Sequence, residues 1–314
     1  LLYQSQLTNQ KRLMKNIIFF ALLLVFLFFN TLNAQSNLLN AKVPQEVGQM
    51  NEQQIEAENV TPVEYGYVDD RDILWSKTIW EIVDLDERIN FPYYYPTINN
   101  GYLSSNRKSL FRVLMDGIIE GNITEVYSTD YFNDKLTYED LQEVLELRRL
   151  SPEGISKQNA GENVTEDDYD IYKIESDKVI QYRIKGTWYF NKRLGELRYR
   201  MLGIAPVAPD VSTLSEGPEA MANALVPLFW IWFPDAREEL NKNKVFNSRN
   251  SSQPITYDMM LNSRRFNSTI YKEENVYEDR EVKEYIYEDA LRQLLESDRI
   301  KSVIRDFEQD QWNN

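Results

Sequence analysis

Carboxylates, lysines and tyrosines supply the acid–base chemistry of this sequence, because histidine and cysteine are both absent. That absence excludes thiol nucleophiles, disulfides, thiolate or imidazole metal sites, and any triad that uses a histidine base. A pair of carboxylates could still act as acid and base on a glycosidic bond. A carboxylate-dependent enzyme acting on periplasmic glycans is therefore one alternative, although no recognisable motif sets two carboxylates opposite each other.

One acidic stretch has the composition of a calcium loop. It contains Glu166, Asp167, Asp168 and Asp170 within five positions. An EF-hand loop needs a glycine at its sixth position and a glutamate at its twelfth, and this stretch lacks the glycine. We interpret it as part of a solvated loop, and we expect no metal, cofactor or catalytic residues.

Basic residues gather on one predicted hairpin. Residues 179–190 alternate apolar and polar side chains, a turn containing Gly195 follows, and residues 196–204 alternate again. One face of this hairpin is aromatic and suits a core. The other face carries the four candidate partner-binding residues Arg183, Lys185, Arg198 and Arg200. A solvated face, or protection of an edge strand, is the simpler explanation, and a partner-binding surface is the alternative.

The net charge of the chain disfavours some classes of binding partner. The chain of 314 residues has a formal net charge of −15 and no block basic enough to offset it. Nucleic acid is therefore an unfavourable partner, and anionic lipid surfaces would repel the chain. Its 20 tyrosines are typical of proteins that bury amphipathic rings at interfaces.

The N-terminal part predicts export. Residues 1–13 are expected to be an over-extended upstream segment, with translation starting at Met14. Residues 14–34 have the pattern of a cleaved secretory signal peptide: Lys15, an apolar block and Ala34. An uncleaved anchor is the alternative, but the block is short for a membrane span. Residues 35–68 then read as an extended or disordered arm, either a linker or a segment that orders against a neighbour.

Residues 69–314 predict one α+β domain, with an antiparallel hairpin and a buried central strand packed with several amphipathic helices. We expect a helical first part at 69–150, a loop at 151–178 and a sheet-plus-helix part at 179–314. The first helix should start at Asp69 and Asp70 and run to about Asn90, with an apolar arc wide enough to be covered by the core or by a neighbouring subunit.

Further elements follow from local patterns. Helices are expected at residues 109–121, from Thr137 onward, at 256–266 and at 282–296, with a last helix restarting at Ser297 and Asp298. Residues 225–235 (LVPLFWIWFPD) should form a central strand buried on both sides, because they do not alternate. Trp230 and Trp232 should then both be core residues.

The chain from about residue 69 onward resembles the GldN family, called PorN in non-gliding relatives. The resemblance rests on several stretches in order: residues 70–77 (DRDILWSK), 85–90 (LDERIN), 225–232 (LVPLFWIW), 234–237 (PDAR), 250–255 (NSSQPI), 270–275 (IYKEEN) and 305–312 (RDFEQDQW). None of them is a catalytic motif.

The resemblance implies a structural, non-enzymatic periplasmic subunit of the type IX secretion and gliding motility machinery of Bacteroidota. It implies a ring of many copies, formed with a GldK/PorK-like lipoprotein at the inner face of the outer membrane and coupled to a GldM/PorM-like motor protein. No nucleic acid and no cofactor are implied, and membrane association would be indirect, through the lipoprotein.

Overall fold

The computed structural model describes residues 61–98, 107–246, 255–287 and 289–312. The chain divides into two units, residues 1–59 and 60–314, and the described residues lie in the second. The predicted signal peptide and most of the predicted arm therefore lie outside the described residues.

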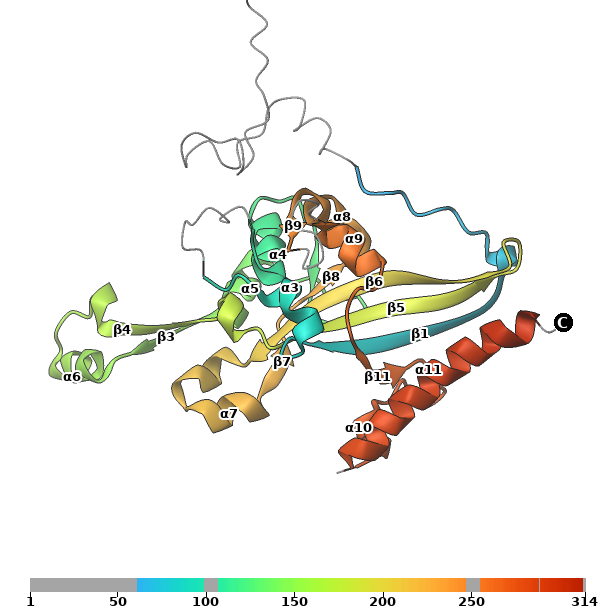
Figure 1. Ribbon diagram of the computed structural model, residues 1–314. Coiled ribbons are helices and arrows are strands. Elements are labelled where there is room, and N and C mark those ends of the chain that lie inside the picture. The colour runs from blue at the N-terminus through green and yellow to red at the C-terminus, as the bar shows by residue number, and fades with distance from the viewer. Residues whose placement is uncertain (1–60, 99–106, 247–254, 288, 313–314) are drawn as a thin grey trace, which may run out of the picture. The chain divides into compact units, whose positions relative to one another are not determined.

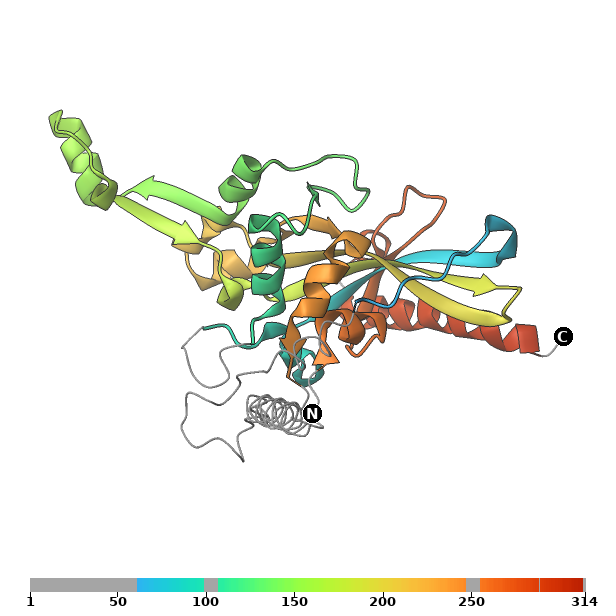
Figure 2. The same cartoon turned by 90° about the horizontal axis from the view of Figure 1, so that it is seen from above.

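One antiparallel sheet organises the described chain, in the strand order β11-β1-β5-β6-β8-β2 with β7 beside β6 (Figures 1 and 2). Two short pairs, β3–β4 and β9–β10, lie outside it. The strands are β1 (Ile73–Asp84), β2 (Val126–Tyr127), β3 (Glu146–Leu150), β4 (Tyr169–Lys173), β5 (Gln181–Asn191), β6 (Glu196–Pro209), β7 (Leu225–Pro227), β8 (Trp230–Trp232), β9 (Lys244–Val245), β10 (Ile255–Thr256) and β11 (Thr269–Glu273).

Helices surround this sheet, which confirms the predicted α+β class. They are α3 (Phe91–Tyr94), α4 (Leu110–Ile119), α5 (Tyr138–Leu145), α6 (Pro152–Ala160), α7 (Pro218–Asn223), α8 (Phe233–Lys242), α9 (Tyr257–Asn262), α10 (Val282–Tyr285) and α11 (Ala290–Trp312). Two of these helices begin with side-chain caps. Ser109 accepts the amide of Arg112 at the start of α4, and Thr137 and Asp140 form a capping box on α5.

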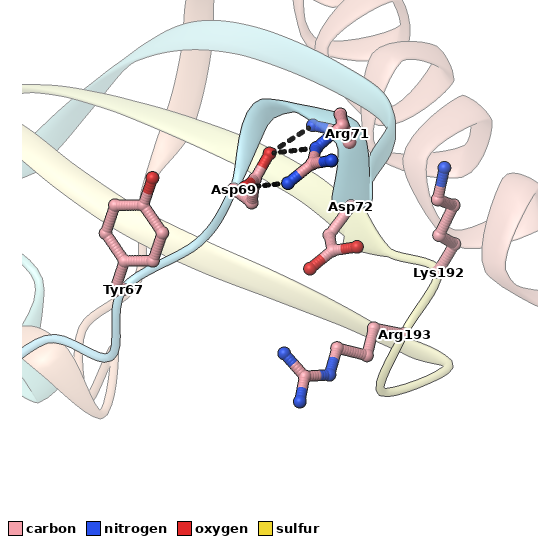
Figure 3. Close-up of a pocket in the computed structure, with 6 residues that line it drawn as sticks. All are labelled: Tyr67, Asp69, Arg71, Asp72, Lys192 and Arg193. Carbon is pink, nitrogen blue, oxygen red and sulfur yellow. Dashed lines mark hydrogen bonds and ion pairs between the residues drawn. The ribbon is translucent and has the colours of Figure 1, made fainter.

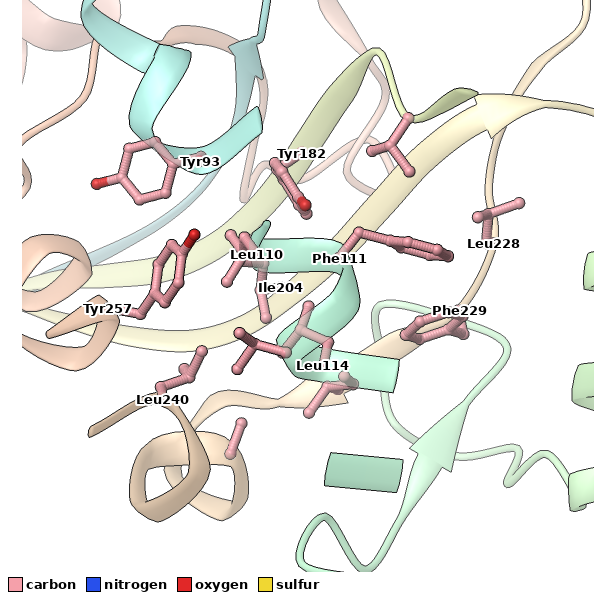
Figure 4. Packing of buried hydrophobic residues seen from close by; sticks show 14 of the residues in the cluster. Tyr93, Leu110, Phe111, Leu114, Tyr182, Ile204, Leu228, Phe229, Leu240 and Tyr257 are labelled. Atoms are coloured by element: carbon pink, nitrogen blue, oxygen red, sulfur yellow. The ribbon is translucent and has the colours of Figure 1, made fainter. Parts of the chain in front are cut away.

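The sheet has two faces of different character, because successive side chains of a strand point to opposite sides. On the core face, Val83 of β1 pairs with Tyr182 of β5, and Ile184 of β5 pairs with Ile204 of β6. Helices α4, α8 and α9 supply much of the apolar cluster around them (Figure 4). Ile300 and Ile304 of α11 form a second cluster on the same face. We call the opposite side the charged face, since it carries Lys185 and Arg200.

The predicted first helix is wrong, because residues 73–84 form strand β1. Asp69 does cap a turn, but only the short 3-10 turn Asp70–Asp72. The wide apolar arc arose because β1 is an inner strand with buried side chains on both faces, Ile79 on one and Trp80 on the other. The chain's own core covers both. With β1 and β2 present, the expected helical character of residues 69–150 is also wrong in part.

The predicted central strand at residues 225–235 is interrupted and lies toward the sheet edge. It divides into β7 and β8 around Leu228 and Phe229, and α8 starts at Phe233. Trp230 is 3% exposed, as expected, but Trp232 is 36% exposed. Its burial was therefore predicted wrongly, since β8 carries only the short strand β2 on its outer side.

Two further boundaries differ from the prediction. Residues 151–178 are not a simple loop, because they contain α6 and β4. The C-terminal break lies between α10 and α11, before Ala290, and not at Ser297. Ser297 is fully buried within α11, and its hydroxyl accepts the amide of Ile270 at 2.8 Å. A capping-type residue here bonds to a strand instead of starting a helix.

Candidate functional site

The four predicted partner-binding residues do share one face of the β5–β6 hairpin. The register places Arg183 opposite Ala205, Lys185 opposite Gly203, Arg200 opposite Thr187 and Arg198 opposite Tyr189. A bulge in β6 at residue 202, between the Gly203 and Met201 pairings, shifts the alternation of β6 by one residue. Arg198 and Arg200 therefore point to the same face as Arg183 and Lys185. None of the four stands directly opposite another, so no direct cross-strand repulsion arises between them.

Lys185 lies at what we call the covered end of the charged face, where residues 130–132 lie over the strands. Its ammonium donates to the carbonyl oxygen of Asp130 at 2.8 Å. Lys272 of β11 forms an ion pair with the Asp130 carboxylate at 3.1 Å. Both ammonium groups lie over the Trp80 ring, at 4.8 and 4.3 Å from its centre, and Tyr131 is close to both. Such cation–π contacts compensate partly for the lost water.

The pKa values of the two lysines are shifted in opposite directions. Burial lowers the pKa of Lys185, and nearby carboxylates, Asp130 first, offset this only in part. Burial also acts to lower the pKa of Lys272, but hydrogen bonds to Asp130 and Tyr131 outweigh it, so that pKa is raised. Asp130 therefore stabilises one ammonium by direct pairing and the other through its backbone.

Close packing fixes the covering segment to the sheet. A Cβ atom at Gly203 would lie 2.5 Å from the ring of Phe132, so only glycine permits this contact. Phe132 itself has a positive φ of 58°, which is uncommon for a bulky residue. Its ring lies edge-on to Trp232 and Trp230. Glycine on β6 and a strained aromatic residue together bring the loop onto the charged face.

Arg183 is also held at the covered end. Its guanidinium lies over the ring of Tyr271, 5.1 Å from the centre. Its Nε and the indole nitrogen of Trp80 are buried donors without a hydrogen-bond partner in the described structure. Arg183 and Lys185, two of the four candidates, are thus taken up by the chain's own side chains.

The other two candidates lie at what we call the open end of the charged face. Arg198 forms an exposed ion pair with Glu196 at 2.7 Å. Arg200 donates to the carbonyl oxygen of Gly66 at 3.0 Å, and its guanidinium lies over the rings of Tyr65 and Tyr189. Exposed ion pairs of this kind contribute little to stability.

The segment that contains Tyr65, residues 63–66, is held beside β6 by contacts to side chains, and we call it the strap. Arg237, which is paired with Asp258 at 2.8 Å, donates to the carbonyl oxygen of Val63 at 2.7 Å. The Tyr65 hydroxyl donates to the Asn262 side chain at 2.6 Å. Its ring contacts both Arg237 and Arg200. Burial raises the pKa of Tyr65 to about 12. The sequence contained no signal for these contacts.

A shallow cavity of about 440 Å³ lies beside the hairpin turn (Figure 3). It is lined by Tyr67, Asp69, Arg71, Asp72, Lys192 and Arg193. Asp69 accepts the guanidinium of Arg71 at 2.9 Å, and this hydrogen bond lowers the pKa of Asp69. A general acid for glycan cleavage needs the opposite shift. The mixture of charges is better suited to binding a charged surface than to proton transfer.

The pKa values of carboxylates elsewhere in the described chain are shifted in the same direction as that of Asp69. Every described carboxyl group whose pKa departs from its ordinary value is shifted downward, toward the charged form: Asp69, Glu125, Asp140, Asp168, Asp210 and Glu296. Within the described ranges, no group of three acidic side chains is placed to hold a metal ion. None of the described helices combines the length and apolar character that crossing a bilayer requires.

These features define an α+β sheet protein whose basic side chains are held by aromatic rings, carbonyl groups and a few carboxylates. A family model described as "Gliding motility associated protein GldN" matches residues 68–313. The chain therefore belongs to the GldN family, as its sequence motifs indicated. A comparison with curated proteins gave no match.

Proposed function

We propose that this chain is a structural subunit of the type IX secretion and gliding motility machinery in the periplasm. In this proposal it forms a ring with a GldK/PorK-like lipoprotein at the inner face of the outer membrane, and a GldM/PorM-like motor protein couples to that ring. Membership of the GldN family over residues 68–313 is the observation that carries the proposal.

The division of the charged face supports a binding role at the open end. Arg183 and Lys185 are occupied by the sheet and its covering loop, whereas Arg198 is exposed. Arg200 donates to the carbonyl oxygen of Gly66 in the strap and lies over the rings of Tyr65 and Tyr189. A lipoprotein surface that supplies carboxylates could bind these two arginines without disturbing the core. We therefore restrict the proposed lipoprotein contact to Arg198 and Arg200.

The experiment is co-purification of the tagged chain with the lipoprotein from detergent-solubilised envelopes, followed by electron microscopy of the particle. Replacing Arg198 and Arg200 by Glu should leave circular dichroism unchanged and should strongly reduce recovery of the lipoprotein. The wild-type interaction should weaken with added salt, because exposed charges are screened.

A matched control reverses Arg292, an exposed residue of α11 with 77% of its side chain accessible. Arg292→Glu should retain the lipoprotein. A folded Arg198→Glu/Arg200→Glu variant that also retains the lipoprotein would contradict the assignment of the open end. Failure of the wild-type chain to co-purify would contradict the ring role itself.

A further inference from the structure

A segment that the rest of the described chain covers poorly lies at one end of the β5–β6 hairpin. We call it the arm from here on; it is not the N-terminal arm predicted at residues 35–68. The arm comprises β3, α6 and β4, and its buried side chains are few. Asp168 ties it together, since its carboxylate binds Lys157 of α6 and accepts the Thr165 amide, and its carbonyl accepts the Ser151 amide. A two-stranded pair is marginally stable in water unless something packs against it.

Apolar side chains of this arm face solvent. Ile171 is 52% exposed, and Ile155 and Tyr169 are exposed too. The surrounding charge is negative, because exposed acids outnumber the bases. Glu153, Glu162, Asp167 and Asp170 are exposed and form no ion pair with a described residue. Tyr169 and Ile171 share one face of the β3–β4 pair with Arg148, which is paired with Glu146 and Glu166, while Asp170 points to the other face. The arm therefore presents an apolar patch, and we call its unpaired acids Glu153, Glu162 and Asp167 the acidic border.

The turn of the β5–β6 hairpin has the complementary chemistry. Leu194 is 51% exposed at its tip. Lys192 and Arg193 precede it, are exposed, and form no ion pair within the described ranges. The side chain of Asn191 accepts the amides of Arg193 and Leu194 at 3.0 and 3.1 Å, which holds the turn in one conformation. The tip thus presents one leucine beside two cations on a rigid support.

Tip and arm cannot meet within one chain. The arm contacts the turn Val211–Ser215, which follows the C-terminal end of β6. The tip lies at the other end of the hairpin, where it joins the C-terminal end of β5 to the N-terminal end of β6. Strand β5 has 11 residues, which separates the two by about 35 Å at ~3.3 Å per residue. Figures 1 and 2 show the arm (green) and the hairpin turn (yellow) pointing in opposite directions.

We propose that the hairpin tip of one copy docks on the arm of a second copy, with Leu194 against Ile171 and Tyr169, and with Lys192 and Arg193 against the acidic border. Such a head-to-tail contact uses two different surfaces, so it repeats from copy to copy and closes into a ring when the rotation permits. The inference that this ring serves secretion rests on the proposed function. The contact itself does not.

Disulfide trapping tests this contact, and the absence of cysteine gives a clean background. Leu194→Cys and Ile171→Cys variants, carrying tags of different size, are mixed and oxidised. The docked pair should give a cross-linked heterodimer in much higher yield than a control mixture of Leu194→Cys with Val303→Cys, a residue of α11 that is also partly exposed. Equal yields in the two mixtures would overturn the proposal.

A charge exchange provides a second readout. Lys192→Glu/Arg193→Glu in the Leu194→Cys chain should lower the heterodimer yield about tenfold at low salt, as expected for reversed charges at an interface. Glu162→Lys/Asp167→Lys in the Ile171→Cys chain should restore it. Absence of any rescue would contradict the charge pairing. If the lipoprotein still co-purifies with wild type while cross-linking equals the control, the docking fails and the proposed function stands.

Discussion

The covered and open ends of the charged face carry the same kind of residue in different surroundings. At the covered end, Lys185 is buried against Trp80 and bonds to Asp130. At the open end, Arg198 has only an exposed partner two residues away, Glu196. The difference does not arise from the hairpin strands, which direct all four basic side chains to the same face. It arises from a loop between β2 and α5 that reaches one end and not the other.

This contrast separates structural basic residues from available ones. A buried ammonium needs partners in its own chain, because desolvation would otherwise make its charge costly. An exposed guanidinium needs none and can exchange water for a partner's carboxylate. The covered end should therefore determine stability, and the open end should determine association.

The largest effect is expected from the tryptophans beside Phe132. Trp230→Ala removes a side chain that is 3% exposed and should lower the free energy of unfolding by about 3–5 kcal/mol. Trp232→Ala, at 36% exposed, should cost roughly half as much. Urea unfolding of both variants measures the two values. Equal losses would mean that Trp232 is as deeply buried as Trp230.

A smaller effect should separate the two ends directly. Lys185→Met keeps the length of the side chain but leaves the Asp130 carbonyl without its donor, at a cost of about 1–3 kcal/mol. Arg198→Met should change the free energy of unfolding by less than about 0.5 kcal/mol, since its ion pair is exposed. Similar urea midpoints for the two variants would remove the distinction between covered and open ends.

The sequence was sufficient for the hairpin and insufficient for its cover. Residues 179–190 and 196–204 alternate over many positions, so strand period and turn were both readable. The continuation of β6 to Pro209 was not, because residues 203–209 are buried without alternation. Nothing local to Lys185 indicated that Asp130 and Tyr131 would lie on it, because that contact joins segments far apart in the chain. The four basic residues were thus placed on the correct face, while the burial of two of them was missed.

The misassigned strand β1 has a related cause. Its charges at Lys77 and Glu81 are spaced as a helical ion pair would be, yet Lys77 pairs with Glu273 and Glu81 with Arg264. An inner strand is apolar on both faces, and such a pattern is also that of a buried helix. Its tryptophan, isoleucine and threonine content favoured a strand, and gave the better signal.

The smallest effect concerns the strap at the open end. Tyr65→Phe removes the hydrogen bond to Asn262 and should cost about 0.5–1.5 kcal/mol. The pKa of Tyr65 is raised to about 12, so the folded chain keeps this proton at a pH where the unfolded chain loses it. Its stabilising contribution is complete below pH ~10 and falls as pH rises toward about 12.

Tyrosinate absorbance of the wild type, compared with Tyr65→Phe, isolates this phenol. The account expects the difference spectrum to titrate near the upper limit of that window. A difference that titrates near pH 10, the ordinary value for a free tyrosine, would show that the Tyr65 ring is not buried in the folded chain, because burial is what raises its pKa.

Hydrogen–deuterium exchange along the β5–β6 hairpin, in the purified chain and in the assembled ring, tests the central claim most directly. If the covered end is satisfied by its own chain and the open end is left for another, amides of residues 191–200 should gain protection on assembly. Amides of residues 182–186 should exchange alike in both samples. Protection gained equally at both ends, or only at the covered end, would contradict the account.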